Sequence, residues 1–205
     1  MEQQFQYYAF ISYKREDEKW AKWLQDRLRW YKLPSKLCRQ ITRLPKKVWP
    51  VFRDNTDLDS GRLEENIRHE LERSHYLIVI CSPEAARSPW VGKEVKYFAT
   101  LHGADKIIPF VVSGIPYSND IETECIHEQI KAISQEELLA INVREEGIGS
   151  FAMKKKRAFI RVVARLLDIK FNTLWQPYER ILRIRKWSTG TVSYTHLTLP
   201  TKRIV

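Results

Sequence analysis

The chain has 205 residues, of which 43% are apolar and 29% charged, and its mean hydropathy is negative. This composition fits a globular protein of one domain, or slightly more, and excludes a disordered, collagen-like or disulfide-stapled chain. The 35 Lys and Arg residues against 25 Asp and Glu give a net charge of +10, which favours an anionic partner such as a nucleotide, nucleic acid or lipid headgroup. A solvated basic surface explains the charge equally well.

Location and metal content are also constrained by the sequence. The N-terminus has no basic segment followed by an apolar one, and the longest apolar runs, such as Tyr76 to Cys81, fall far short of the roughly 18 residues of a membrane span. The three cysteines are widely separated and the histidines form no pair, so we expect no metal site. Cysteines in this number and spacing indicate a reducing compartment, and we expect a cytoplasmic protein with no membrane partner.

Short apolar runs alternate with amphipathic segments along the first 187 residues, a pattern typical of βαβ units. The first half predicts, in order, a strand over Tyr7 to Tyr13, a helix over Asp17 to Tyr31, a basic loop, a strand over Val48 to Phe52, a polar turn over Asp54 to Gly61, and a helix through Leu63, Ile67 and Leu71. The second half predicts a central strand over Tyr76 to Cys81, a helix that begins at Ser88-Pro89 and stops at Gly103, a strand over Ile107 to Val112, a short strand over Leu138 to Val143, and a basic helix over Ala152 to Leu167.

This alternation predicts an α/β fold, namely a flavodoxin-like, open, parallel five-stranded sheet with helices on both faces. Ligands of such sheets bind beyond the carboxyl ends of the strands, so we expect the site among the loops 13–16, 53–61 and 82–90. We assign residues 1–168 to this domain and residues 169–187 to a trailing helix that leads to a missing downstream module. Residues 188–205 resemble the translation of a sequencing adapter, and we expect them to be a non-native read-through tail.

The chain lacks the short motifs of several enzyme classes. No GxGxxG, GxxxxGK[ST], GxSxG or HExxH occurs. The chain therefore lacks the signatures of dinucleotide-fold dehydrogenases, P-loop proteins, serine hydrolases and zinc proteases. The segment from Trp90 to Glu94 is more informative. Because Val91, Val95 and Phe98 form the buried stripe of their helix, Trp90 and Glu94 lie on an adjacent stripe, one turn apart, and point the same way.

A carboxylate beside an aromatic ring suits a cationic sugar transition state, since the charge stabilises a positive anomeric carbon and the ring excludes water. A glutamate on a helix is also typical of a solvated partner of a lysine, and Trp90 equally fits a cap over the core. Spacing alone therefore leaves the role of Glu94 open. The basic run Lys154 to Arg157 favours a solvated helix start over a contact with nucleic acid, and we expect no nucleic-acid partner.

Four segments of the chain recur together in a known family. They are Ala9 to Arg15, Val51 to Gly61, Ile78 to Pro83 and Ser88 to Val95. In order and spacing they resemble the successive boxes of a Toll/interleukin-1 receptor (TIR) domain, most closely those of bacterial TIR proteins, over about Tyr7 to Leu167. The resemblance implies the parallel fold described above and an activity that cleaves the bond between nicotinamide and ribose in NAD⁺.

Individual positions match the site residues of that family. Glu94 falls on the catalytic glutamate, and Trp90 on the aromatic residue four positions before it. The remaining substrate-binding positions that the resemblance implies are Phe10 and Ser12 in the floor of the pocket, Lys14 and Arg15 as a basic pair that could meet the pyrophosphate, and Asp54 as the acid after the second strand.

The resemblance makes NAD⁺ a substrate, and we expect no cofactor. Attack by water would give ADP-ribose, whereas attack by an adenine or ribose atom would give a cyclic isomer. We expect self-association through TIR–TIR contacts and a role in antiphage defence. The alternative is a non-catalytic TIR scaffold that acts by homotypic assembly without turnover, although a scaffold has no need for a carboxylate at position 94.

Overall fold

The computed structural model describes residues 5–41, 44–45, 47–53, 61–133, 140–144, 149–176 and 179. A single sheet forms the centre, with the strands β1 (Tyr7–Ser12), β2 (Val51–Arg53), β3 (Ser74–Cys81), β4 (Ile107–Val111) and β5 (Ile141–Asn142). All four pairings are parallel, and the strand order is β2-β1-β3-β4-β5. This order is that of the flavodoxin-like doubly wound folds, so the predicted fold class is confirmed.

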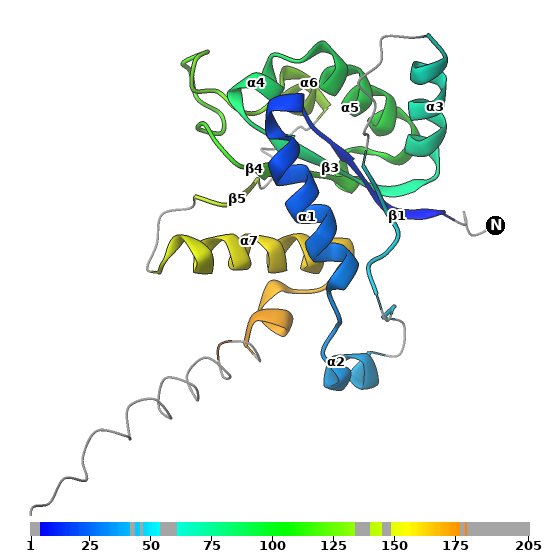
Figure 1. Ribbon diagram of the computed structural model, residues 1–205, viewed down its shortest axis with the longest axis vertical. Coiled ribbons are helices and arrows are strands. Elements are labelled where there is room, and N and C mark those ends of the chain that lie inside the picture. The colour runs from blue at the N-terminus through cyan, green and yellow to red at the C-terminus, as the bar shows by residue number, and fades with distance from the viewer. Residues whose placement is uncertain are drawn as a thin grey trace, which may run out of the picture.

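Helices cover both faces of the sheet (Figure 1). They are α1 (Glu18–Trp30), α2 (Ser35–Gln40), α3 (Gly61–Glu72), α4 (Pro83–Ala86), α5 (Pro89–His102), α6 (Glu128–Ile133) and α7 (Phe151–Leu166), with short 3-10 turns at Arg15–Asp17 and Ala104–Lys106. Helices α1 and α7 pack on one face, and α3, α5 and α6 pack on the other. The chain is therefore built in three layers, and a site on one face is separated from the other face by the sheet.

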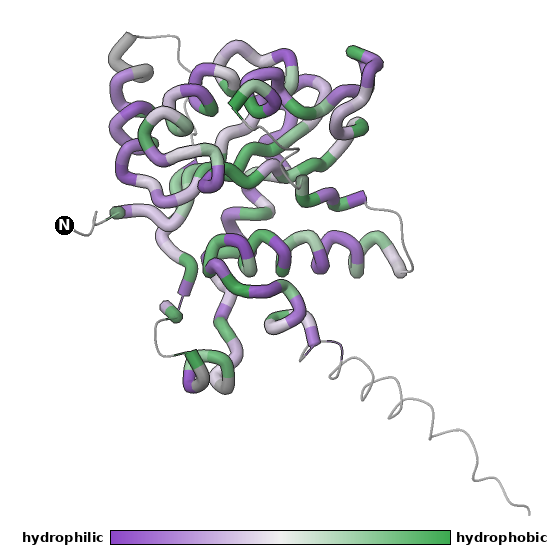
Figure 2. Tube along the Cα trace, turned by 180° about the vertical axis from the view of Figure 1, so that it is seen from behind, coloured by the Kyte–Doolittle hydropathy of each residue, from purple (hydrophilic) through white to green (hydrophobic). Residues whose placement is uncertain are grey.

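Alternation along the strands divides the apolar core in two. Ala9 and Ile11 join the cluster under α1 and α7, whereas Phe10, between them, joins the cluster under α3 and α5. Strands β3 and β4 alternate in the same way, and every residue of β4 is buried. Parallel strands covered on both faces need apolar side chains on both, which explains the uninterrupted apolar run of β3. Figure 2 shows the hydrophobic colour on the strands and on the inner stripes of the helices.

Helix α5 begins and ends where the sequence predicts. Ser88 is its N-cap residue, Pro89 occupies the first turn, and Gly103 follows its last residue with a φ of 88°. Proline suits the first turn because the amide hydrogens there have no acceptor within the helix. A residue with a side chain would be strained at the φ of Gly103, so glycine ends the helix at low cost.

The boundaries of other elements differ from the prediction. Strand β2 begins at Val51 rather than Val48, because Pro50 has no amide hydrogen to donate to the ladder and joins it only through its carbonyl, which accepts from the Tyr8 amide at 2.7 Å. The expected basic loop contains α2, and α6 was not expected; both have only six residues, too few to show a helical period. The fifth strand is confirmed at Ile141–Asn142, and residues 134–139 lie outside the described residues.

The predicted division into parts is only partly within the described residues. Residues 171–176 are helical, and Leu174 and Trp175 are buried in the cluster under α1 and α7, so the trailing segment starts against the domain. The rest of the predicted trailing helix, apart from residue 179, lies outside the described residues, as does the predicted tail over 188–205. The boundary at residue 168 stays a prediction.

One buried and two partly buried histidines predict that the fold loses stability in mild acid. Burial lowers the pKa of His75, His102 and His127 below the ordinary value of 6.5. The unfolded chain therefore takes up these protons before the folded chain does, and stability present above pH 6.5 is lost as the pH falls through the lowered values. We expect the urea midpoint of unfolding to be lower at pH 5.5 than at pH 7.5.

Two controls make this prediction specific. Replacing His75 and His102 together by Gln should reduce the loss of stability between the two pH values, whereas His69→Gln, at an exposed position of α3, should leave it unchanged. Asp17 has the opposite effect on stability. Burial raises its pKa, so its contribution to the free energy of unfolding grows as the pH falls toward 3.8. The comparison therefore stops at pH 5.5. A midpoint that rises on acidification would contradict the prediction.

Candidate active site

The carboxylate of Glu94 is held below the surface at the carboxyl end of β1. Glu94 is 8% exposed, and its neighbours on the helix, Val91 and Val95, are buried against the sheet. The hydroxyl of Ser12, the last residue of β1, donates a hydrogen bond to one Glu94 carboxylate oxygen across 82 positions of sequence. The strand end and the helix thus fix the carboxylate together. This arrangement differs from that of a solvated glutamate paired with a surface lysine.

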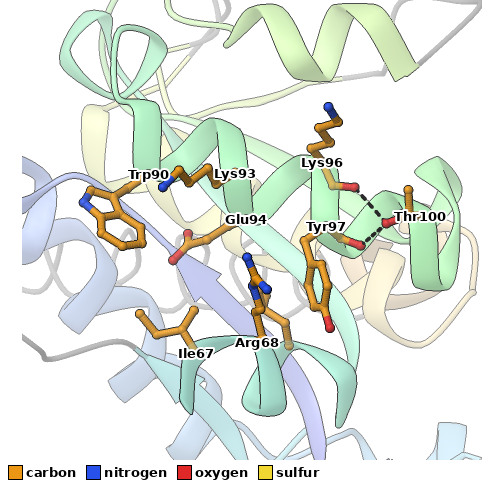
Figure 3. A pocket seen from close by; sticks show the side chains of 9 residues that line it. Ile67, Arg68, Trp90, Lys93, Glu94, Lys96, Tyr97 and Thr100 are labelled. Carbon is orange, nitrogen blue, oxygen red and sulfur yellow. Dashed lines mark hydrogen bonds between the residues drawn. The ribbon is translucent and has the colours of Figure 1, made fainter. Parts of the chain in front are cut away.

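Glu94 lies at one end of a pocket between α3 and α5 (Figure 3). The pocket has a volume of about 310 Å³, and its lining is mostly apolar with one carboxylate and three cations. The lining residues are Ile67, Arg68, Leu71, Trp90, Lys93, Glu94, Lys96, Tyr97 and Thr100. A cavity of this size and character can hold part of a small ligand and exclude most water from it.

Trp90 and Glu94 lie together at this end of the pocket, as their spacing predicts (Figure 3). Trp90 is 40% exposed and stands at the mouth of the pocket, so it does not cap the core. The ammonium of Lys93 lies 4.7 Å from the centre of the Trp90 ring. On the opposite wall, the guanidinium of Arg68 lies 5.5 Å from the centre of the Tyr97 ring. The aromatic faces and the cations of the pocket are therefore interleaved.

The other predicted site residues are not all brought to this pocket. Phe10 is fully buried beneath α3 and α5 and stacks on Phe52 with 5.3 Å between ring centres, so it supports the pocket from below without lining it. Lys14 and Arg15 lie in the turn after β1; Lys14 is half-buried, Arg15 is exposed, and neither lines the pocket. Asp54 lies outside the described residues.

A second buried carboxylate, Asp17, stands at the same edge of the sheet and was not expected. The hydroxyl of Ser82, which follows β3, donates to Asp17 Oδ2 at 2.5 Å and also accepts from the Ala85 amide at 3.1 Å. Asp17 is 7% exposed, and this burial raises its pKa. The contact ties the start of α1 to the end of β3 and so stiffens the edge at which the site lies. Because Asp17 stands at the start of a predicted helix, the sequence alone indicates a helix cap and gives no sign of the contact with Ser82.

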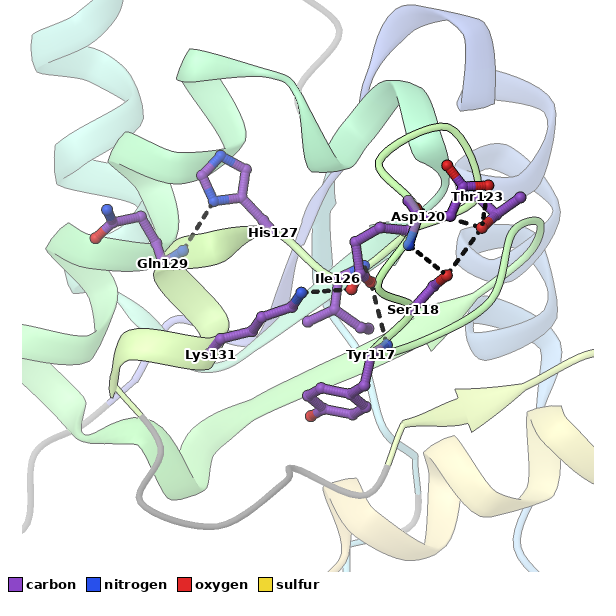
Figure 4. Close-up of polar contacts among 9 residues, drawn as sticks. Tyr117, Ser118, Asp120, Thr123, Ile126, His127, Gln129 and Lys131 are labelled. Atoms are coloured by element: carbon purple, nitrogen blue, oxygen red, sulfur yellow. Dashed lines mark hydrogen bonds and ion pairs between the residues drawn. The ribbon is translucent and has the colours of Figure 1, made fainter.

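His127 holds α5 from the side away from the pocket. Its ring is buried, its Nδ1 accepts from the Gln129 amide at 3.0 Å (Figure 4), and it is hydrogen-bonded to the backbone of Ser88. A β-carbon on Gly92 would lie 2.5 Å from His127 Cε1, so only glycine allows the ring this close to the helix. The first turns of α5, which carry Trp90 and Glu94, are therefore fixed from behind as well as by Ser12.

The part of the chain that the structure describes has neither a metal-binding cluster nor a membrane-spanning helix. Within it, no group of three or more His, Cys, Asp or Glu side chains is arranged to hold a metal ion. No helix in that part combines the length and the apolar character needed to span a bilayer. Cys38, Cys81 and Cys125 are free thiols.

The fold and the site define a flavodoxin-like α/β domain with a buried carboxylate at the carboxyl edge of its sheet. The family model of the TIR domain matches residues 9–146, and the chain belongs to this family. The match includes the four segments on which the resemblance was based, and the predicted family is confirmed.

One named protein and one solved structure are similar to parts of the chain. The chain is 36% identical over 110 residues to a protein named NAD(+) hydrolase ApTIR from Actinoplanes sp., and the match covers 53% of this chain and 14% of that protein. The chain therefore spans only a small part of the length of this relative. Among solved structures, the TIR domains of the activated Roq1 resistosome, which recognises the pathogen effector XopQ, match 75% of this chain and 98% of theirs, with 14% identity and a TM-score of 0.48.

The contact between Gly92 and His127 predicts the effect of a single methyl group. Gly92→Ala should destabilise the fold by about 1–3 kcal/mol, because either the ring or the helix must move. Chemical denaturation measures the loss, and Gly92→Ala combined with His127→Ala should cost less than the sum of the two single changes, since the smaller side chain leaves room for the methyl group. Strict additivity would show that the two residues do not press on each other.

Proposed function

We propose that this TIR domain cleaves the nicotinamide–ribose bond of NAD⁺, with Glu94 as its catalytic residue. The proposal is supported by the family, by the name of the relative from Actinoplanes sp., and above all by the buried Glu94 carboxylate at the end of a pocket. Burying a charged group costs several kcal/mol unless it is paired, and such costs are concentrated at functional sites. A scaffold would gain nothing from holding this carboxylate in place.

The chemistry needs only one carboxylate. In NAD⁺ the nicotinamide ring is a pyridinium cation, and it leaves as a neutral molecule when the glycosidic bond breaks and both bonding electrons stay on the ring nitrogen. No acid is required to protonate the leaving group, unlike in an ordinary glycosidase. Glu94 stabilises the positive charge that develops on the ribose carbon and accepts hydrogen bonds from the ribose hydroxyls. Its charge acts strongly because the Glu94 side chain itself is buried.

The residues around Glu94 would bind the rest of the dinucleotide. The indole of Trp90 would cover the nicotinamide ring at the mouth of the pocket, with Ser12 and Phe10 beneath. Lys14 and Arg15 remain the proposed partners of the pyrophosphate, because they follow β1 at the carboxyl edge of the sheet. Arg68 and Lys93, which sequence reasoning did not select, stand closer to the pocket and are alternative partners for the same phosphates.

The product and the biological setting belong to this proposal as well. Water attack gives ADP-ribose, nicotinamide and a proton, and attack by an adenine or ribose atom of the same molecule gives a cyclic isomer. We propose that the chain works in the cytoplasm, that it self-associates through TIR–TIR contacts, and that it serves antiphage defence. Self-association is the reason to assay the enzyme at high protein concentration, since a neighbouring chain can complete a pocket.

Replacing Glu94 gives the decisive test. We expect the parent protein to release nicotinamide from NAD⁺, and Glu94→Ala and Glu94→Gln to lower the rate by about a hundredfold or more, because the negative charge that stabilises the positive reacting carbon is lost. Chromatography of the reaction mixture measures nicotinamide and separates ADP-ribose from cyclic products. Glu84→Gln, an exposed carboxylate of α4 outside the pocket, is the matched control and should keep the parent rate. Equal release by the parent and by Glu94→Ala would leave the non-catalytic scaffold.

Ser12 is expected to act by orienting Glu94. Ser12→Ala removes the hydrogen bond to the carboxylate, and kcat should fall by about ten- to a hundredfold with a smaller change in KM, since the group is misplaced rather than lost. Steady-state kinetics of nicotinamide release separates the two constants. Ser35→Ala, at an exposed position at the start of α2, should leave both unchanged. A change confined to KM would mean that Ser12 only binds substrate.

A further inference from the structure

A second pocket lies on the other side of the sheet, between α1 and α7. Its volume is about 580 Å³, which is within the roughly 300–1,000 Å³ of small-molecule sites. It is lined by Trp23, Arg27, Trp30, Tyr31, Lys32, Ser150, Ala152, Met153, Lys155, Lys156, Phe159 and Ile160. Because α1 and α7 pack on one face and α3 and α5 on the other, the sheet separates this pocket from Glu94.

The lining combines aromatic faces with cations. Four of its side chains are aromatic and four are cationic, and none of the described residues that line it is acidic. Trp30 is 75% exposed, which is unusual for a tryptophan of a folded domain and leaves a ring face open to a ligand. Rings of this kind stack on a nucleobase, and lysine and arginine side chains bind phosphate oxygens.

Two of the cations are held close together inside this pocket. The ammonium of Lys155 lies 4.5 Å from the ring centre of Trp20 and 4.2 Å from that of Trp23, so this partly buried cation contacts both indoles. Burial and the nearby Arg27 both lower the pKa of Lys155. The like charges of Lys155 and Arg27 repel each other, and a bound anion would offset this repulsion.

We propose that the pocket between α1 and α7 binds a purine nucleoside diphosphate, with the base on Trp30 and the phosphates on Arg27 and Lys155. The aromatic rings and the cations are both required by this ligand class, whereas a simple anion would use the cations alone. Free ADP, ADP-ribose and the adenylate half of NAD⁺ all carry this group. The site does not depend on the proposed cleavage of NAD⁺, because it lies on the opposite face of the sheet.

Calorimetric titration of the full chain with ADP tests the proposal. We expect ADP to bind, and we expect Arg27→Gln combined with Lys155→Met to weaken this binding by about tenfold or more. Methionine keeps a long apolar stem against the two indoles, so the variant should fold, and circular dichroism verifies this. Lys22→Gln combined with Lys154→Gln removes the same charge from the same two helices outside the pocket and should change the affinity less than about twofold. Trp30→Ala should weaken binding of ADP but not of inorganic pyrophosphate.

A series of ligands identifies the chemical class that binds and the natural molecule that supplies it. Adenosine and inorganic pyrophosphate should each bind more weakly than ADP, and titrations with ADP-ribose and with NAD⁺ on the Glu94→Ala variant show which natural ligand fits best. The proposal is overturned if ADP does not bind at about 1 mM, or if the Arg27/Lys155 variant binds it as the parent does. Pyrophosphate that binds as tightly as ADP would overturn the nucleotide assignment and leave an anion site. If Glu94→Ala no longer cleaves NAD⁺, the titrations on this variant still report binding to the pocket between α1 and α7.

Discussion

The hydrogen bond from Ser12 to Glu94 is the interaction on which the candidate active site depends. A carboxylate that is 8% exposed has lost most of its water, a cost of several kcal/mol, and the hydrogen bond from Ser12 offsets about 1.5–3 kcal/mol of it. The packing of α5 onto the sheet keeps the carboxylate at this depth. The apolar residues of α5 and β1 therefore hold a carboxylate in a buried position that is unfavourable for a charged group. Such unfavourable burial is typical of functional residues.

Much of this could be predicted from the sequence, and the reasons are physical. The apolar run of β3, the Ser88-Pro89 start of α5 and the glycine after it are local features, and each determined an element to within a residue or two. The pairing of Trp90 and Glu94 on one side of the helix followed from the helical period alone. The family resemblance added Ser12, because nothing local marks it as the partner of a residue 82 positions away. The other positions that the resemblance alone implied either do not line the pocket or lie outside the described residues.

What could not be predicted arises from contacts between distant segments. His127 packs on Gly92 from a loop, and no periodicity relates the two; Arg68 and Lys93 reach the pocket only because α3 lies beside α5. The order of the strands brings these segments together, and it becomes visible only when the sheet is assembled. Short helices such as α2 and α6 were missed because one and a half turns hold too few residues to show a period.

The proposed catalytic residue and the proposed phosphate-binding residues stand on different kinds of structure. Glu94 stands on a helix that is fixed in front by Ser12, behind by His127 and at its end by Gly103, so its carboxylate has little freedom. Lys14 and Arg15, in contrast, lie in a turn, where a change of sequence costs the core nothing. A rigid helix supplies the precision that charge stabilisation of a transition state requires, since a small displacement would waste most of it. If the proposed function holds, substrate preference can vary in the turns after the strands while the carboxylate stays where it is.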